Sequence, residues 1–337
     1  MKKKRIILSF DYELFFGERS GTVQKTLINP TNLLLDCMDS VGAKGSFFID
    51  YLMFERLEQL EDERAKSDLR LVKEQVKDIV RRGHRIELHL HPHWIDARYN
   101  GDGTWDYSDF THYSLYSLSK EEVARQFREG TAYLTNLARE VDPEYKIVAF
   151  RAGGWTIQPF DILKECFIEN GIVIDSSVMH GVCQDNKYSK FDFREAPNKE
   201  YYHFSNDVCV EDKNGKFVEV PITVYSKPLW LRIADKVLST LGKKNVPMTD
   251  GTHKRNDLPE VNQESSTFGS KNYAFSLSWQ TPRIVYYLFR VSKMSLITFI
   301  DHPKDFTTST LPIIKHCAKN AEFLTYFDLN RNNYYSL

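Results

Sequence analysis

The sequence is poor in the features that mark secreted, membrane-spanning or thiolate-metal proteins. Its 5 cysteines are scattered over 337 residues with no Cys-x-x-Cys pair, which is typical of buried thiols in a reducing compartment. No apolar stretch approaches the roughly 20 residues of a transmembrane helix. Met1 and the basic residues 2–5 resemble the start of a signal peptide, but Asp11 soon interrupts the apolar run that follows. We therefore expect a cytoplasmic protein without a signal peptide or a membrane span.

The sequence also lacks an excess of charge of one sign, and it lacks the common motifs of nucleotide-binding and serine-hydrolase sites. The net charge is −1, which gives no electrostatic basis for binding nucleic acid. No P-loop, no Gly-x-Gly-x-x-Gly turn after a strand and no Gly-x-Ser-x-Gly elbow occurs, so the usual motifs of nucleotide, dinucleotide and serine-hydrolase sites are excluded. Aromatic residues make up 13% of the chain, and they suit sugar stacking and core packing equally well.

Helical patterns alternate with short apolar runs over the first half of the chain. An apolar stripe predicts a helix over about 57–82, which Gly83 would end. Ser119 opens a capping box and a second long helix, and a third helix over 159–170 precedes Gly171. Alternation of this kind predicts a parallel sheet or barrel with right-handed crossovers.

The second half of the chain departs from this alternation. Length alone allows one large domain or two smaller ones. Residues 243–272 are rich in Lys, Asn, Asp, Ser and Gly, which indicates a mobile polar loop. We expect a single domain over 1–337, with a loop or lid insertion at about 181–292 and a final strand at 296–300.

Polar side chains follow five apolar runs at the point where each run ends. Because the carboxyl ends of parallel strands meet on one rim, and α/β barrels build active sites there, we expect these side chains to lie together. They comprise two carboxylates, a histidine cluster, an arginine, a third acid and a late histidine: Asp11 and Glu13, His89 to His93, Arg151, Asp175, and His302. This set of residue types resembles a metallohydrolase site.

The histidine cluster follows the alternation of a strand. Ile86, Leu88 and Leu90 are apolar, so the intervening Glu87, His89 and His91 share the opposite, inward face. A turn after Pro92 could bring His93 back towards His89. Imidazole is a common ligand of zinc and similar divalent ions, so the cluster predicts a metal site. The alternative is a hydrogen-bonded polar cluster without a metal.

The remaining tips suit acid–base chemistry. Asp11 and Glu13 share a face, so that one could complete a metal triad while the other serves as general base, although a charged strand end is the simpler interpretation of this pair alone. Arg151 would orient a carboxylate and keep it ionised, which a structural salt bridge would also do. Asp175 could orient His302 or cap a helix, and His302 could act as general acid.

These residues, in this order, resemble five motifs of the polysaccharide deacetylase family, carbohydrate esterase family 4. The motifs cover residues 5–305, most of the chain. The matching segments are Ser9-Phe10-Asp11-Tyr12-Glu13, Gly83-His84-Arg85-Ile86 with His89 and His93, Phe150-Arg151-Ala152-Gly153-Gly154-Trp155, Ile174-Asp175-Ser176-Ser177, and Ile300-Asp301-His302-Pro303. The chain differs from the pattern at Tyr12, where a second aspartate is usual, at Leu90, where Ser or Thr is usual, and at the additional histidine His91.

The resemblance implies an irregular (β/α) barrel of about seven parallel strands that removes an N-acetyl or O-acetyl group from a carbohydrate. It implies a divalent metal ion, most often Zn²⁺, held by three residues: Glu13, His89 and His93. It also implies catalytic roles for four others: Asp11 as base, Arg151 holding Asp11, Asp175 pairing with His302, and His302 protonating the leaving amine. A cytoplasmic location favours a glycan precursor as substrate. The alternatives are a metallophosphoesterase, a cyclic-amide hydrolase and a non-catalytic glycan-binding protein.

Overall fold

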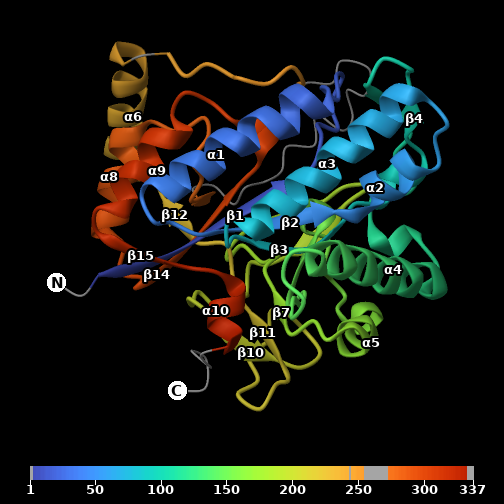
Figure 1. The fold of residues 1–337 in the computed structure, drawn as a ribbon. Coiled ribbons are helices and arrows are strands. Elements are labelled where there is room, and N and C mark those ends of the chain that lie inside the picture. Colours follow the sequence, from blue (N-terminus) through green and yellow to red (C-terminus); the bar gives the residue numbers. More distant parts are fainter. Residues whose placement is uncertain (1–2, 243, 254–271, 332–337) are drawn as a thin grey trace.

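The computed structural model describes residues 3–242, 244–253 and 272–331, which form a mixed α/β fold around one curled sheet (Figure 1). Seven consecutive strands of this sheet are parallel, as predicted. In spatial order they are β11 (Phe217–Glu219), β7 (Ile174–Asp175), β6 (Ala149–Ala152), β3 (Arg85–Leu90), β2 (Gly45–Asp50), β1 (Lys4–Tyr12) and β14 (Leu296–Asp301). The antiparallel β10 (Tyr202–Phe204) extends one edge, and β15 (Ala321–Leu324) pairs with the start of β1. The expected irregular barrel of about seven strands is confirmed.

The curl of the sheet brings its two ends together. The chain that leaves β11 reaches the free edge of β14, where the Thr223 amide donates to the Thr298 carbonyl over 3.0 Å. The Ile300 amide donates to the Phe275 carbonyl at the same edge, also over 3.0 Å. These bonds partly close the barrel, so that strand tips from opposite ends of the sheet face one space.

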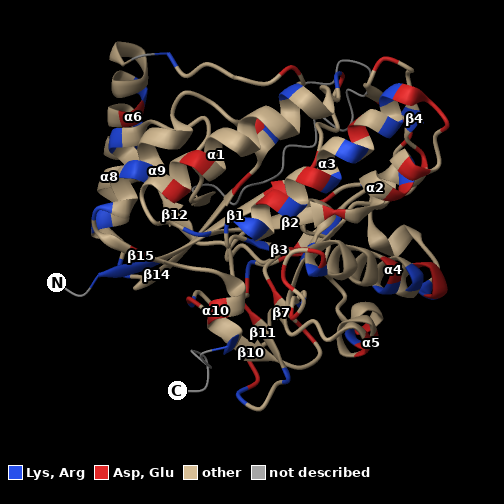
Figure 2. Cartoon of the chain, viewed as in Figure 1, with Lys and Arg blue, Asp and Glu red and all other residues tan. Residues whose placement is uncertain are grey.

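Helices cover the outer face of the sheet, and Figure 2 marks the positions of charged residues along α1, α3 and α4. The helices are α1 (Asn29–Ser40), α2 (Tyr51–Glu58), α3 (Glu63–Arg81), α4 (Lys120–Arg139), α5 (Asp161–Asn170), α6 (Leu229–Leu241), α8 (Pro282–Val291) and α9 (Thr310–Ala318). A further helix, α10 (Tyr326–Arg331), packs on the inner apolar layer instead. Short helical turns are η1 (Val23–Ile28), η2 (Pro92–Ile95), η3 (Leu115–Ser117), η4 (Gly153–Trp155) and η5 (Pro303–Asp305). No helix in the described ranges is long and apolar enough to cross a membrane.

The helix ends follow the local signals in the sequence, with one difference. The predicted helix over 57–82 is two helices, α2 and α3, because Asp62 caps the second by accepting from the Ala65 amide over 2.9 Å. Ser119 caps α4 in the predicted way, accepting from the Glu122 amide over 3.2 Å. Gly171 ends α5 with a φ of 68°, the left-handed conformation that glycine adopts at little cost.

Alternation along the strands divides the interior into two apolar layers. Residues 6, 8 and 10 of β1 pack outwards against the helices, and so do 86, 88 and 90 of β3. Inside the barrel, Ile7, Phe48 and Leu296 pack with the side chains of α10. Polar residues of the inward face, among them Ser9 and Asp11, therefore continue this inner layer towards the carboxyl ends of the strands.

The described part of the expected insertion, 181–292, contains short antiparallel pairs and the amphipathic helices α6 and α8. The pairs are β8 (Cys183–Asp185) with β9 (Lys190–Asp192), and β12 (Val224–Ser226) with β13 (Asn272–Ala274). A further pair, β4 (Arg98–Tyr99) with β5 (Trp105–Asp106), precedes α4. Most of the predicted mobile loop, residues 243 and 254–271, lies outside the described residues. Within 244–253, Asp250 accepts hydrogen bonds from Thr22 and Thr26.

Glu87 tests whether buried side chains on the inner face of the barrel stabilise the fold by accepting hydrogen bonds from backbone amides. Its buried Oε2 accepts from the Val148 and Ala149 amides, each over 2.9 Å. We expect Glu87→Leu to lower the free energy of unfolding by about 2–4 kcal/mol, because two buried amides lose their acceptor. Glu87→Gln, which keeps an acceptor oxygen, should cost less than half as much. Urea unfolding followed by circular dichroism measures both, and equal losses would contradict this account.

Candidate active site

The predicted strand tips meet on one rim of the barrel. Asp11 is the last residue but one of β1, Glu13 directly follows the strand, His89 lies near the end of β3, and Arg151 lies in β6. All four residues are at least 96% buried, although their side chains are ionisable. Buried ionisable groups require partners, so the contacts among these residues indicate what the site can do.

Arg151 is fully buried and holds Asp11. Its Nη1 donates to Asp11 Oδ1 over 2.6 Å, and its Nε donates to the Ser176 carbonyl over 2.7 Å. Its Nη2 donates to three hydroxyl groups: Ser9, Ser176 and Tyr326. Burial lowers the pKa of Arg151, but the Asp11 carboxylate more than offsets this, and the net pKa lies above its ordinary value. The guanidinium therefore stays charged and fixes the orientation of Asp11.

Glu13, His89 and His91 form a group that could hold a metal ion. One ligand atom from each lies within 4.8 Å of the others, and all three residues are buried. The Arg151 carbonyl lies 2.7 Å from His89 Nδ1, so this nitrogen carries the proton and Nε2 faces Glu13 Oε2 at 3.2 Å. Burial lowers the pKa of His91 to about 3 and keeps that imidazole neutral. For His89, burial lowers the pKa, but the hydrogen bond to Glu13 and nearby carboxylates raise it to about 9.

His93, the predicted third ligand, lies behind His91. The turn η2 begins directly after His91, and His93 Nδ1 sits 2.6 Å from His91 Nδ1. Its ring lies 3.7 Å from that of Phe16, centroid to centroid, and its Nε2 is buried without a hydrogen-bond partner among the described residues. The geometry thus groups the additional histidine His91, rather than His93, with Glu13 and His89. The assignment of either histidine as a ligand remains a prediction.

Lys304 is a site residue that the sequence motifs did not reveal. Its buried Nζ donates to Glu13 Oε1 over 2.7 Å and to the Leu14 carbonyl over 3.2 Å. Burial raises the pKa of Glu13. The positive charge of Lys304 and the hydrogen bond to His89 lower that pKa by more than burial raises it, so the net pKa lies well below the ordinary value. The only indication of this role in the sequence was a lysine two residues after the strand-end His302. Sequence spacing alone does not show that its side chain contacts Glu13.

His302 faces both carboxylates of the first strand. Its Nε2 lies 3.6 Å from Asp11 Oδ2 and also 3.6 Å from Glu13 Oε1. Its Nδ1 lies 3.3 Å from Asp305 Oδ2, and Asp305 Oδ1 pairs with His253 Nε2 at 2.7 Å. Burial lowers the pKa of His302, but the bond to Asp305 and the nearby carboxylates raise it above its ordinary value overall. Asp305, which sequence reasoning missed, is therefore the carboxylate that orients His302.

Asp175 has other partners than the predicted His302. Its carboxylate accepts from the Ser177 amide over 3.0 Å and from the Ser177 hydroxyl over 2.8 Å. Its other neighbour is Glu219, directly opposite in the parallel pairing of β7 with β11. Burial raises the pKa of both carboxyls, and their mutual repulsion raises that of Glu219 further. A shared proton between the two acids follows from this arrangement.

Asp50 at the end of β2 is a second acid that the motifs did not reveal. It is fully buried, and its Oδ2 accepts from the indole N–H of Trp94. Burial raises the pKa of Asp50 to about 8, against the opposing effect of His89. Near neutral pH this carboxyl group is therefore largely protonated, so it adds little negative charge beside the histidines.

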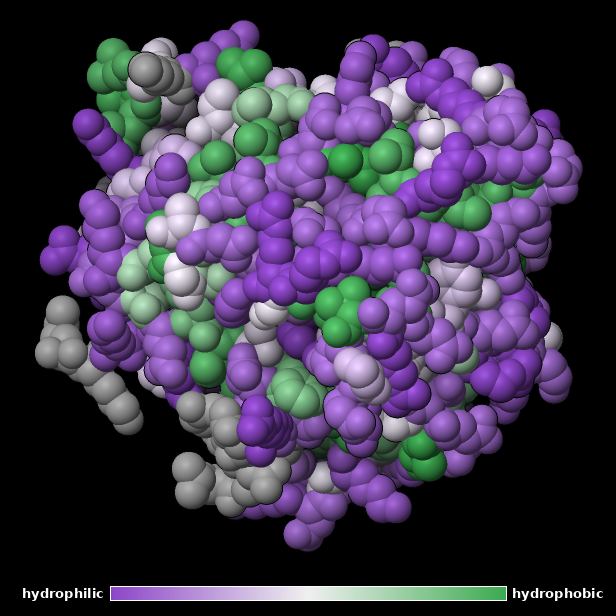
Figure 3. All heavy atoms as spheres, in the orientation of Figure 1, coloured by the Kyte–Doolittle hydropathy of each residue, from purple (hydrophilic) through white to green (hydrophobic). Residues whose placement is uncertain are grey.

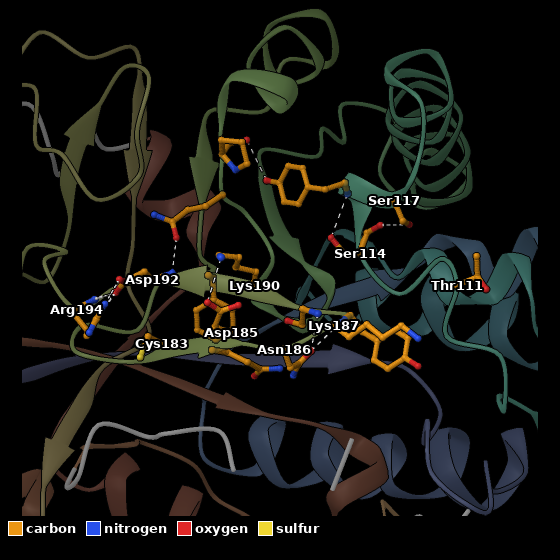
Figure 4. A pocket seen from close by; sticks show the side chains of 17 residues that line it. Thr111, Ser114, Ser117, Cys183, Asp185, Asn186, Lys187, Lys190, Asp192 and Arg194 are labelled. Atoms are coloured by element: carbon orange, nitrogen blue, oxygen red, sulfur yellow. Dashed lines mark hydrogen bonds and ion pairs between the residues drawn. The ribbon is translucent and has the colours of Figure 1, made fainter. Parts of the chain in front are cut away.

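A cavity of about 860 Å³ lies between residues 111–117 and the β8–β9 hairpin (Figure 4). Two ion pairs on the hairpin, Lys190 with Asp185 and Arg194 with Asp192, balance four of the charges that line it. The first segment also contains Tyr113, whose ring lies 5.3 Å from that of His91, centroid to centroid. Tyr113 does not itself line the cavity, so the cavity and the candidate metal ligands are related only through this segment of the chain.

No protein-family model matches the chain, and no curated protein matches it in sequence. Among solved structures, the chain is similar to a putative polysaccharide deacetylase from Mycobacterium smegmatis, with 14% identity over 100% of this chain and 92% of that chain and a TM-score of 0.47. It is also similar to a polysaccharide deacetylase from Bacillus cereus, with 11% identity over 96% and 92% of the two chains and a TM-score of 0.41. It is similar as well to a 4-alpha-glucanotransferase from Thermococcus litoralis, with 11% identity and a TM-score of 0.49. That match covers 98% of this chain and 40% of the glucanotransferase chain.

Proposed function

We propose that the protein is a metal-dependent hydrolase that removes an N-acetyl or O-acetyl group from a carbohydrate. The observation that carries the proposal is the buried Arg151–Asp11 pair, which lies beside His302 on one side and near a Glu-His-His group on the other. A fixed carboxylate base, an opposing imidazole acid and a set of metal ligands are the parts that acyl hydrolysis by an activated water requires.

The residues of the group fit a borderline divalent ion such as Zn²⁺. Two imidazoles and one carboxylate match the ligands of catalytic zinc sites. His89 has its Nδ1–H fixed by the Arg151 carbonyl, the kind of outer contact that orients a ligand histidine. When bound, such an ion would polarise the acetyl carbonyl and make water more acidic. The choice between His91 and His93 as the second histidine ligand belongs to this proposal.

Asp11 and His302 would divide the proton transfers. Arg151 occupies Oδ1 of Asp11, so Oδ2 is the oxygen that would accept a proton from water. His302 Nδ1 faces Asp305, so Nε2 is the nitrogen that would deliver a proton to the leaving amine or alcohol. The 3.6 Å separation of Oδ2 from Nε2 exceeds an ordinary hydrogen bond, so the two groups can act on different atoms of the substrate.

The cavity between residues 111–117 and the β8–β9 hairpin supports a carbohydrate as substrate. Four of its five charged lining residues form two ion pairs, and the fifth, Lys187, lies over the Tyr188 ring. Its walls also offer hydroxyl and amide groups together with the rings of Tyr116, Tyr188 and Phe191. Such groups hydrogen-bond sugar hydroxyls and stack on sugar rings. The buried thiols Cys37, Cys166 and Cys317 favour a reducing compartment and hence a glycan precursor.

Lys304 favours a second candidate, a non-catalytic glycan-binding protein on the same fold. Its ammonium group already neutralises Glu13. A cation supplied by the chain itself would satisfy this carboxylate without a metal ion, and the remaining pocket could still bind a sugar. The two candidates differ in whether Glu13 exchanges Lys304 for an ion.

Metal content and acetate release test the proposed function directly. We expect elemental analysis of metal-replete protein to find about one zinc or similar ion per chain. We expect His89→Ala and His91→Ala to lose it. The control His316→Ala, which changes a half-buried histidine that stacks on Tyr286, should retain it. His93→Ala decides which second histidine binds. Acetate release from N-acetylglucosamine oligomers should fall by about 10²–10⁴-fold in Asp11→Asn. Replete protein that holds no metal and releases no acetate would leave the glycan-binding candidate.

Replacing Lys304 should strengthen metal binding. Lys304→Met removes a cation 2.7 Å from Glu13 Oε1, so that the carboxylate is free to bind a divalent ion. We expect zinc affinity, measured by isothermal titration calorimetry, to rise by about 10- to 100-fold. Without metal the variant should be less stable than the wild type, because Glu13 is then a buried charge without its main partner. Unchanged zinc affinity in a folded variant would show that Lys304 does not compete for Glu13.

Asp305 should set the alkaline limit of activity. The acid form of His302 is required, so activity falls as the pH rises through its pKa. Because Asp305 raises that pKa, Asp305→Asn should lower it and move the alkaline limb of the kcat profile to lower pH. Asp250→Asn, an acid that binds Thr22 and Thr26 instead, is the matched control. A lower kcat with an unmoved limb would indicate a purely structural role.

A further inference from the structure

Helix α6 exposes an apolar face to solvent. Four of its side chains recur at intervals of four residues and therefore form a line that winds slowly around the helix: Leu229, Ile233, Val237 and Leu241. Leu229 is 70% exposed and Leu241 80%, and the neighbouring Trp230 is 56% exposed. Only Leu231 of this helix is buried. Figure 3 shows hydrophobic residues gathered over α6, on a surface that is otherwise mostly hydrophilic.

Helix α8 continues this face. The exposed ring of Tyr287 lies 5.7 Å from that of Trp230, centroid to centroid, and the exposed Val291 follows one turn later. We call the seven exposed apolar residues of the two helices the α6 face: Leu229, Trp230, Ile233, Val237, Leu241, Tyr287 and Val291. A contiguous exposed apolar surface of this kind is uncommon on proteins that have no partner for it.

Cationic side chains border the α6 face. At 100° per residue, Arg232 and Lys236 lie on α6 beside the line of apolar residues. Arg283 and Arg290 lie exposed on α8, beside Tyr287. No acidic group is within ion-pair distance of these four cations in the part of the chain that the structure describes. The acid of α6, Asp235, is paired with Lys227 at 2.7 Å. Figure 2 shows this scarcity of acidic residues on α8.

We propose that the α6 face binds the surface of an anionic lipid bilayer, with α6 lying in the plane of the interface. Apolar side chains on one face with arginine and lysine beside them form the pattern of helices that lie at the membrane interface. The apolar residues would enter the boundary of the acyl chains, while the long cationic side chains reach the phosphates.

The full-length protein tests this with vesicles of two compositions. We expect co-sedimentation with vesicles of phosphatidylcholine and phosphatidylglycerol, weak binding to phosphatidylcholine alone, and loss of binding in about 0.5 M salt, because salt screens surface charge. Ile233→Ser/Val237→Ser should reduce binding at least tenfold, since it removes two apolar anchors. Arg232→Gln/Lys236→Gln should abolish the preference for the anionic vesicles. Ile168→Ser/Val210→Ser, which changes two exposed apolar residues away from the face, is the matched control.

Three results would overturn the proposal. Folded protein could bind neither type of vesicle, or the Ile233→Ser/Val237→Ser variant could bind as well as the wild type. Light scattering could instead find a dimer that this variant dissociates, in which case the α6 face joins two copies of the chain. Circular dichroism and thermal unfolding establish that each variant is folded. No residue of the α6 face belongs to the candidate active site, so acetate release should be unchanged in these variants, and the membrane proposal stands or falls independently of the proposed function.

Discussion

The buried pair of Arg151 and Asp11 is the interaction on which the rest of the site depends. Five hydrogen bonds from one guanidinium connect β1, the segment after β7 and helix α10 to the central strand β6. Its charged carbon also lies 4.2 Å from the centroid of the Phe48 ring on β2. Removing one partner of such a pair leaves the other charge buried and unpaired, which typically costs about 3–5 kcal/mol. The same contacts therefore hold the barrel together and fix the orientation of Asp11.

The inward face of the barrel changes from apolar to charged along the strands. Ile7, Ser9 and Asp11 follow one another on the inward face of β1, from apolar to hydroxyl to carboxylate. Helix α10 packs against the apolar end, and the hydroxyl group of its Tyr326 reaches the guanidinium of Arg151 over 3.1 Å. The hydroxyl groups of Ser9, Ser176 and Tyr326 thus solvate the guanidinium of Arg151 where it lies nearest to the apolar core. The candidate site occupies the opposite end of the barrel, where strand ends and turns supply polar groups.

The sequence predicts the parts of this site that strand periodicity controls. Asp11, His89 and Arg151 come from three strands far apart in the chain, yet the alternation of two residues and the common direction of parallel strands bring them to one rim. What it misses lies in turns and in strand order. Lys304 and Asp305 reach the site from the turn η5, whose geometry sets where they point. Asp175 meets Glu219 because β7 lies beside β11, a neighbour relation that no local pattern encodes.

The departures at Tyr12 and Leu90 are explained by the same alternation. Both residues face outwards into the helical layer, where Tyr12 is buried and donates to Gln75 over 2.7 Å. A carboxylate at position 12 would point away from the histidines, so Glu13, next along the inward face, is the acid that reaches them. Glu13 lies deep enough to need a positive partner at all times. Lys304 supplies one in the chain as it stands, and a metal ion would be another. The balance between these two cations at one carboxylate is therefore the physical question that separates a hydrolase from a binding protein on this fold.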